Sequence, residues 1–286
     1  MNKAYFKYIL ALLLFGSNGI VASHISLSSY EIVLMRTLIG SLLLIAIFTL
    51  TRGKYTFWQH WQQFFFLVTS GIAMGTSWLF LFEAYQQIGV SISTLAYYCA
   101  PVIVMVLSPL LFHEKLTLPK AAGFLTVLCG VFLVNGIAFQ EGKTGWGLFC
   151  GMMSAVMYAL MVISNKKAKD IIGLENAMLQ LSISFLAVAV FVSIKQGLAI
   201  QIASENWMPI LILGLLNTGI GCYLYFSSIG YLPVQTVAIS SYLDPLSAVI
   251  FSVLFLGETM LPIQILGAVL ILGGAVFGEC ISTSKD

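Results

Sequence analysis

YEIVLMRTLIGSLLLIAIFTLT, residues 30–51, is a run of 22 residues that contains only two charged side chains, Glu31 and Arg36. A helix needs about 20 apolar residues to cross the hydrocarbon core of a bilayer. Similar runs recur along the whole chain, which is 59% hydrophobic and only 8% charged. Because a soluble domain carries about 25% charged residues, this composition excludes a soluble enzyme, a nucleic-acid-binding protein and a disordered protein.

These runs predict an all-α integral membrane protein with ten transmembrane helices. The runs are continuously apolar and longer than the alternating stretches of a transmembrane β-barrel, which favours helices over strands. The connections between them are mostly short, and none is long enough for a soluble domain. The predicted spans are 5–23, 30–51, 63–86, 91–112, 118–138, 146–165, 174–194, 208–229, 234–256 and 262–280.

Lysines and arginines in the loops predict the orientation, because positive residues collect on the cytoplasmic side of a membrane. With a cytoplasmic N-terminus, ten of the thirteen basic residues fall on the inner side. Only Lys143 and Lys195 fall on the outer side, and Arg36 lies within a span. We therefore expect a multi-pass protein of the cell membrane with both termini in the cytoplasm.

An internal repeat divides the chain into two halves, predicted as residues 1–140 and 145–286. At an offset of 144 residues, YCAP at 98–101 falls on YLDP at 242–245, and many other residues coincide in the same register. Each half holds five predicted spans, and this odd number gives the two halves opposite orientations. Two inverted five-helix repeats are typical of transporters, whose similar halves open a central site to each side in turn.

Short motifs accompany the repeat: FEAY at 82–85 leading into Pro101, EKLT at 114–117, SYLDP at 241–245 and LGE at 256–258. In these motifs the chain resembles the drug/metabolite transporter superfamily, specifically its ten-helix EamA-type branch. The resemblance covers essentially the whole chain, once per half. It implies a small-molecule transporter. Members of the family move amino acids, nucleotide sugars, choline-like cations or drugs, so the fold alone leaves the substrate open.

Asp244 lies about ten residues into the ninth predicted span, or about 15 Å along a helix that rises 1.5 Å per residue. That depth is near the midplane of a hydrocarbon core about 30 Å thick. A carboxylate there costs about 2.5–3.5 kcal/mol, so we expect Asp244 to face the bundle interior or a wet cavity. Two interpretations stay open. Asp244 binds a cationic substrate or a coupling proton, or it is neutral or hydrogen-bonded and only shapes its helix.

Pro101 and Pro245 occupy matched positions near the middle of the fourth and ninth predicted spans. Each proline removes a helical hydrogen bond and frees a carbonyl four residues earlier, which must find a partner, a water or a ligand at this depth. Both prolines favour a cavity between the halves, although a simple packing kink is the alternative. Neighbouring aromatic rings would suit a cation or a flat metabolite. The residues predicted to line the cavity are Tyr97, Tyr98, Ser241 and Tyr242.

Arg36 lies about 10 Å inside the second predicted span, by the helical rise per residue. A charge at that depth needs a partner, and Glu83 near the outer end of the third span is the predicted one. Three roles stay open for this pair: a structural ion pair between the second and third helices, an outer gate, or an anchor for a substrate carboxylate.

The expected function is secondary-active transport by alternating access. The predicted substrate is a small polar or cationic metabolite such as an amino acid or amine, with nucleotide sugars or drugs as alternatives. An intramembrane enzyme is the competing class, but no HExxH motif, and no GxSxG motif with a suitable histidine, supports catalysis. No Walker A motif or metal-ligand spacing is present. We therefore expect no cofactor, metal or nucleic acid, and only a small-molecule substrate and the bilayer as partners, with a homodimer left open.

Overall fold

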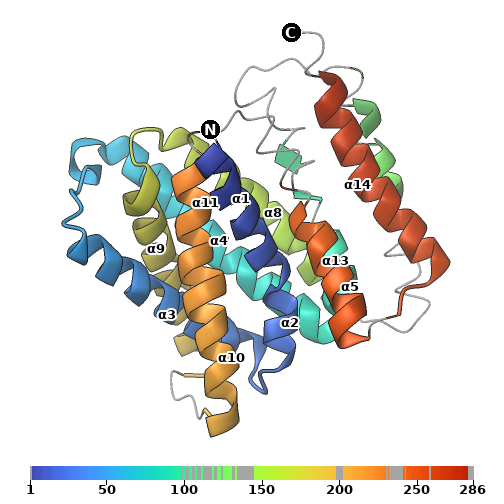
Figure 1. Ribbon diagram of the computed structural model, residues 1–286, viewed down its shortest axis with the longest axis horizontal. Helices are drawn as coiled ribbons and strands as arrows, with labels where there is room; N and C mark the ends of the chain where they lie inside the picture. The colour runs from blue at the N-terminus through green and yellow to red at the C-terminus, as the bar shows by residue number, and fades with distance from the viewer. Residues whose placement is uncertain are drawn as a thin grey trace.

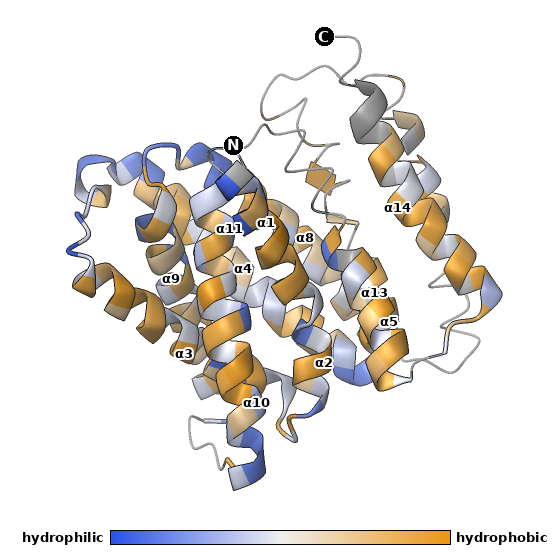
Figure 2. Cartoon of the chain, in the orientation of Figure 1, coloured by the Kyte–Doolittle hydropathy of each residue, from blue (hydrophilic) through white to orange (hydrophobic). Residues whose placement is uncertain are grey.

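The structure, a computed structural model, describes residues 2–97, 99–100, 145–197, 202–229, 243–257 and 259–282, residues 231 and 241, and short pieces between 103 and 133. Over these residues the chain forms helices and connections, with no strand. Figure 1 shows the helices side by side in a bundle, with the apolar residues along the helices and hydrophilic residues gathered in the connections at their ends (Figure 2).

The helices of the first half begin near the start of the chain. They are α1 (Asn2–Gly16), α2 (Asn18–Ser23), α3 (Ser29–Leu50), the 3₁₀ turn η1 (Phe57–Gln59), α4 (Trp61–Ile88) and α5 (Val90–Tyr97). The second half contains α8 (Gly145–Lys167), α9 (Gly173–Lys195), the 3₁₀ turn η2 (Ser204–Asn206), α10 (Trp207–Leu211), the π-helix η3 (Ile212–Ile220), α11 (Gly221–Ile229), α13 (Leu243–Leu256) and α14 (Pro262–Ser282).

Six helical stretches in the described part of the chain are long and apolar enough to cross a membrane. They are Lys3–Ser23, Ser29–Leu50, Trp61–Ile88, Gly145–Lys167, Gly173–Lys195 and Ser204–Ser228. These stretches correspond to the first, second, third, sixth, seventh and eighth predicted spans. The chain is therefore an all-helical, multi-pass membrane protein. The other four predicted spans overlap α5, the apolar stretch Ala121–Gly130, α13 and α14.

Helix boundaries in the two halves correspond when they are shifted by 144 residues. Helices α1 and α2 together fall on α8, α3 falls on α9, and α4 falls on the run from η2 to α11. The first of these pairs differs in one respect. The helix is interrupted at Ser17, between α1 and α2, whereas α8 continues as one helix. The third pair differs too, because η3 interrupts the second-half helix with a nine-residue π-helical segment.

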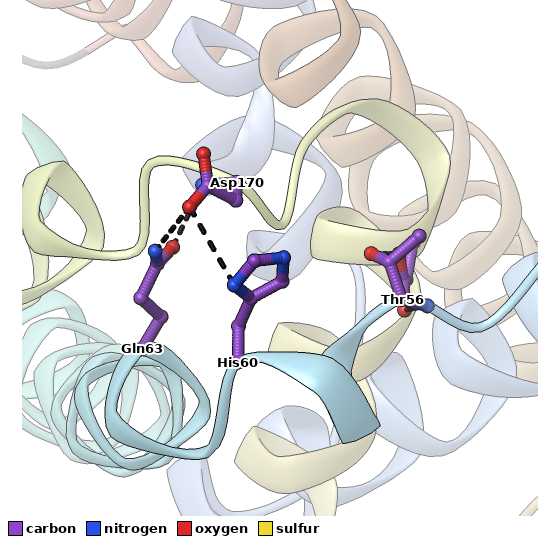
Figure 3. Close-up of polar contacts among 5 residues, drawn as sticks. Thr56, His60, Gln63 and Asp170 are labelled. Atoms are coloured by element: carbon purple, nitrogen blue, oxygen red, sulfur yellow. Dashed lines mark hydrogen bonds and ion pairs between the residues drawn. The ribbon is translucent and has the colours of Figure 1, made fainter.

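The connections at each end of the bundle are tied to one another by hydrogen bonds. Figure 1 shows the start of α1, the end of α14 and the α3–α4 and α8–α9 connections at one end. There, Asp170 accepts a hydrogen bond from Gln63 and lies 3.6 Å from His60 (Figure 3). At the other end, the Ser26 amide donates to Asn206 at 2.9 Å and joins the α2–α3 connection to η2.

Close helix packing in the core depends on small residues. A Cβ atom added to Gly75 of α4 would lie 3.0 Å from the Ser184 carbonyl oxygen and 2.9 Å from a methyl group of Val188, both on α9. One turn earlier, a Cβ atom on Gly71 would lie 2.9 Å from the Gln180 carbonyl oxygen. These two glycines therefore let α4 and α9 approach backbone to backbone, as small-xxx-small patterns do in membrane bundles.

Candidate functional site: a cavity between the two halves

A cavity of about 70 Å³ lies between helices of both halves. One water needs about 10–15 Å³ by the same kind of measure, so the cavity has room for several waters or the end of a small solute. The first half contributes Leu12, Phe15, Asn18, Met74, Ser77, Trp78, Leu81, Tyr85, Thr94, Tyr97 and Ala100 to its lining. The second half contributes Tyr158, Met161, Cys222, Tyr225, Phe226, Ser241, Asp244 and Ala248.

Three of the residues predicted from the sequence line this cavity, namely Tyr97, Ser241 and Asp244. Tyr97 belongs to α5 and is 8% exposed. The predicted site residues Tyr98, Pro101 and Tyr242 lie outside the described residues. Pro245 belongs to α13, but its side chain is likewise outside the description.

Asp244 is the one charged residue among the described residues that line the cavity. It lies in α13, directly before Pro245. Tyr8, Tyr97 and Tyr225 all lie within electrostatic range of the Asp244 carboxylate. The carboxylate therefore sits among phenol groups contributed by both halves.

Tyrosines form a continuous aromatic wall beside Asp244. The Tyr97 and Tyr158 rings pack edge to face with their centroids 5.1 Å apart, and the Tyr158 and Tyr225 hydroxyls are 3.5 Å apart. Tyr225 also packs against Tyr8, at 5.5 Å between centroids. Such a wall presents both π faces, which attract a cation, and hydroxyl groups, which donate or accept hydrogen bonds.

The predicted ion pair between Arg36 and Glu83 is wrong. Arg36 is 1% exposed and donates from Nε to the Thr218 hydroxyl at 2.9 Å and from Nη2 to the Asn18 side-chain oxygen at 3.3 Å. Its guanidinium carbon lies 4.3 Å from the ring centroid of Trp78 and 4.8 Å from that of Phe82. The partners of Arg36 are thus neutral polar groups and aromatic faces.

Glu83 has partners of its own near the end of α4. It accepts hydrogen bonds from the Ser29 hydroxyl at 2.5 Å, from Gln87 at 3.2 Å and from the Trp146 indole at 3.3 Å. These donors come from α3, α4 and α8, so Glu83 joins three helices. Five neutral hydrogen-bond partners, two for Arg36 and three for Glu83, replace the single ion pair, because the helices bring Asn18 and Thr218, not Glu83, to Arg36.

Sequence reasoning missed several cavity-lining residues. Tyr85 lies within the FEAY motif, but it was not assigned to the site, and Tyr158 sits in an apolar run with no nearby marker. Asn18 was missed as well, although an uncharged polar residue inside an apolar span is a signal in itself. It follows the break between α1 and α2, and so it reaches both the cavity and Arg36.

Other features in the described part of the chain do not form a competing site. No group of three or more His, Cys, Asp or Glu side chains is placed there to hold a metal ion. A second hollow of about 470 Å³ lies between α3, α9 and the start of α10. Apart from the Trp207 indole, its lining is entirely aliphatic or phenyl, which suits lipid contact better than recognition of a polar solute: Leu34, Met35, Leu38, Phe185, Ala189, Ile202 and Trp207.

The family model for the EamA-like transporter family matches the chain twice, over residues 2–136 and 145–278. The chain belongs to the EamA-like transporter family. The two matches cover nearly the whole chain and fall on the two halves separated by the 144-residue offset. The protein is accordingly a membrane transporter of the drug/metabolite superfamily and not an enzyme.

Relatives of this EamA-like chain are also transporters. The uncharacterised transporter YxxF of Bacillus subtilis is 27% identical over 278 residues, which cover 96% of this chain and 88% of that protein. The threonine/homoserine exporter RhtA of Escherichia coli K12 is 26% identical over 262 residues, covering 88% and 82% of the two chains. A protein of known crystal structure superposes with a TM-score of 0.70 over 97% of this chain and 98% of its own, and at 19% identity it shows the fold alone.

Proposed function

We propose that this protein is a secondary-active transporter that binds a small polar or cationic metabolite, an amino acid or an amine, in the cavity between its two halves. The observation that carries the proposal is that one cavity, lined from both halves, has one acidic and no basic side chain among the described residues of its lining. The negative charge of this acid attracts cations and repels the diphosphate of a nucleotide sugar. The name of RhtA, a threonine/homoserine exporter, supports an amino compound as the substrate.

Ten helices in two inverted five-helix repeats, 1–140 and 145–286, are the architecture that we propose for alternating access. The correspondence of helix boundaries at the 144-residue offset supports it. The orientation that we propose in the cell membrane has both termini in the cytoplasm. Figure 1 supports it, because the start of α1, the end of α14 and the loops that carry Arg52, Lys54 and Lys169 lie at the same end of the bundle.

Asp244 provides a coupling mechanism in this proposal. A proton and a cationic substrate compete for the same carboxylate, so a proton taken up from one side displaces a substrate released there. An ion gradient or exchange supplies the energy, since the chain carries no Walker A motif.

The test replaces Asp244 by asparagine, which keeps the size of the side chain and removes its charge. Ligand-induced thermal stabilisation of the purified protein is measured with a panel of amines and amino acids. A ligand at 100 times its Kd stabilises the folded state by about 2.7 kcal/mol. We expect the wild-type protein to show this shift with at least one ligand and Asp244→Asn to lose it, together with uptake driven by a pH gradient into proteoliposomes.

Glu205→Gln is the matched control, because it makes the same carboxylate-to-amide change at an exposed residue of η2 outside the cavity lining. We expect it to retain both the shift and the uptake. If Asp244→Asn folds and keeps the wild-type ligand binding and the wild-type pH profile of uptake, the proposed role of Asp244 in substrate binding is refuted.

A further inference from the structure

Arg36 is a buried cation held entirely by neutral groups. The side chain is 1% exposed and lies within α3, a membrane-spanning helix. Its two hydrogen bonds go to the Thr218 hydroxyl and the Asn18 amide oxygen, and its guanidinium carbon lies near the rings of Trp78 and Phe82. An uncompensated charge in such surroundings is costly, and a charged side chain within a membrane span is by default a sign of function.

The Nη1 end of the guanidinium has no hydrogen-bond partner among the described residues. Arginine offers five N–H donors in a planar fork, and only Nε and Nη2 are engaged. The two acids closest to it along the chain are both occupied elsewhere: Glu31 caps its own helix through Ser28, and Glu83 binds Ser29, Gln87 and Trp146. The Nη1 group can therefore donate hydrogen bonds to an acceptor that these residues do not supply.

Two distortions of the helices position this side chain. Asn18 is the first residue after the break between α1 and α2, and Thr218 lies in the π-helix η3. The Thr218 hydroxyl donates to the Leu213 carbonyl, five residues earlier, and accepts from Arg36. Asn217 donates to the Leu14 carbonyl and to Ser17, which ties η3 to the break. Single-turn π-bulges inside α-helices occur frequently at functional sites, and η3 is a longer π segment of nine residues.

Arg36 contacts the lining of the cavity. Asn18 and Trp78, which contact the guanidinium, are both cavity-lining residues. Tyr97, another lining residue, lies within electrostatic range of both Arg36 and Asp244. The Thr94 hydroxyl in the same lining is buried and also has no partner among the described residues. The cavity thus has an acid in its lining, a cation in contact with two lining residues and, among the described residues, an unpaired hydroxyl in its wall.

We propose that Arg36 binds the carboxylate of an amino acid whose ammonium group is bound at Asp244. This inference rests on the proposed function and narrows it, because an amine without a carboxylate leaves Arg36 unpaired. A guanidinium is the side chain best suited to this role, since its fork matches a carboxylate in two parallel hydrogen bonds. Arg36 thereby selects amino acids over simple amines.

The test compares each L-amino acid of a panel with the amine that remains when its carboxylate is removed, for example L-threonine and 1-amino-2-propanol. Dissociation constants are measured on the full-length wild-type protein. Hydrogen bonds to charged groups contribute enough to change affinity about 10- to 100-fold. We expect at least one amino acid to bind more tightly than its paired amine by such a factor. Equal affinities within every pair would overturn the proposal without any variant being needed.

Arg36→Gln and Arg36→Lys then separate recognition from structural support. A purely structural role would weaken both members of a pair equally, whereas recognition predicts that Arg36→Gln binds the two with similar affinity. We expect Arg36→Lys to keep part of the preference, because the charge remains but the fork is lost. Lys195→Gln, the same cation-to-amide change at the exposed end of α9, is the control and should keep the full preference.

A failure of the proposal for Arg36 can be distinguished from a failure of the proposed function by measuring Asp244→Asn as well. If Asp244→Asn still binds the best amine as wild type does, the proposed cation site fails, whatever the result within the pairs. If Asp244→Asn loses the amine but Arg36→Gln keeps the preference for the amino acid, the cation site stands and the role of Arg36 is refuted.

Discussion

Glu175 connects the two halves of the protein at one end of the bundle, and its removal should destabilise the fold. The side chain is 6% exposed and accepts three hydrogen bonds from the α3–α4 connection. The donors are the Thr56 amide at 2.6 Å, the Thr56 hydroxyl at 2.5 Å and the Phe57 amide at 3.0 Å. Both amides bind the same carboxylate oxygen, and the hydroxyl binds the other.

The size of the effect follows from which donors lose their acceptor. Alanine leaves two peptide N–H groups without an acceptor, at about 1–3 kcal/mol for each buried group. Because Thr56 is only partly buried, we expect Glu175→Ala to cost about 3 kcal/mol in total. Glutamine keeps one oxygen for both amides, and its amide nitrogen can donate to the Thr56 hydroxyl. Glu175→Gln should therefore cost only the charge assistance, about 1 kcal/mol.

The assay is thermal unfolding of the purified protein in detergent, followed by tryptophan fluorescence. At about 2–4 °C per kcal/mol, Glu175→Ala should lower Tm by about 6–12 °C and Glu175→Gln by about 2–4 °C. Glu31 is the matched control, since it is the repeat counterpart of Glu175 and also the third residue of its helix. It caps only its own helix, so Glu31→Ala should cost about 1 kcal/mol. Equal shifts for the two alanine variants would refute the reasoning.

Two further predictions concern topology and packing. Reporter fusions after Lys169 and after Lys143 should report the cytoplasm and the outside respectively, and the reverse result would contradict both the orientation and the inverted repeat. Gly75→Leu should separate α4 from α9, because even a Cβ atom there meets the Ser184 carbonyl oxygen at 3.0 Å. We expect a loss of about 1–3 kcal/mol, measured as a lower Tm, whereas Gly273→Ala, where a Cβ atom meets nothing within 4 Å, should leave Tm unchanged.

Much of the fold is predictable from sequence because a bilayer constrains helices by length and apolarity. The second predicted span, 30–51, differs from α3 by one residue at each end, and the sixth, 146–165, lies within α8. The break at Ser17 and the π-helix η3 are not predictable in this way. Both occur inside predominantly apolar runs, and both are joined by tertiary hydrogen bonds, those of Asn217 to Leu14 and Ser17.

The candidate site was only partly predictable for the same reason. Asp244 is conspicuous because a carboxylate in an apolar run demands an explanation, and Tyr97 follows from its distance to a proline. The partners of Arg36 were assigned wrongly because the prediction assumed that a buried cation needs an acidic partner. Asn18 and Thr218 meet it instead, from the first span and from the eighth. Uncharged polar residues at similar depths in different spans are the signal that could have identified them.

The repeat also clarifies why one charge of the site lies in each half. Arg36 has Gln180 as its counterpart and Asp244 has Ala100, so neither charge is duplicated. Glu31 and Glu175, by contrast, are duplicated and serve structure in both halves. A substrate with a carboxylate and an ammonium has two different ends, and a symmetric pair of sites would bind one of them poorly. With Arg36 in one half and Asp244 in the other, an amino acid that contacts both links the halves directly. Its binding energy then depends on how the halves sit relative to each other, which is what alternating access requires of a substrate.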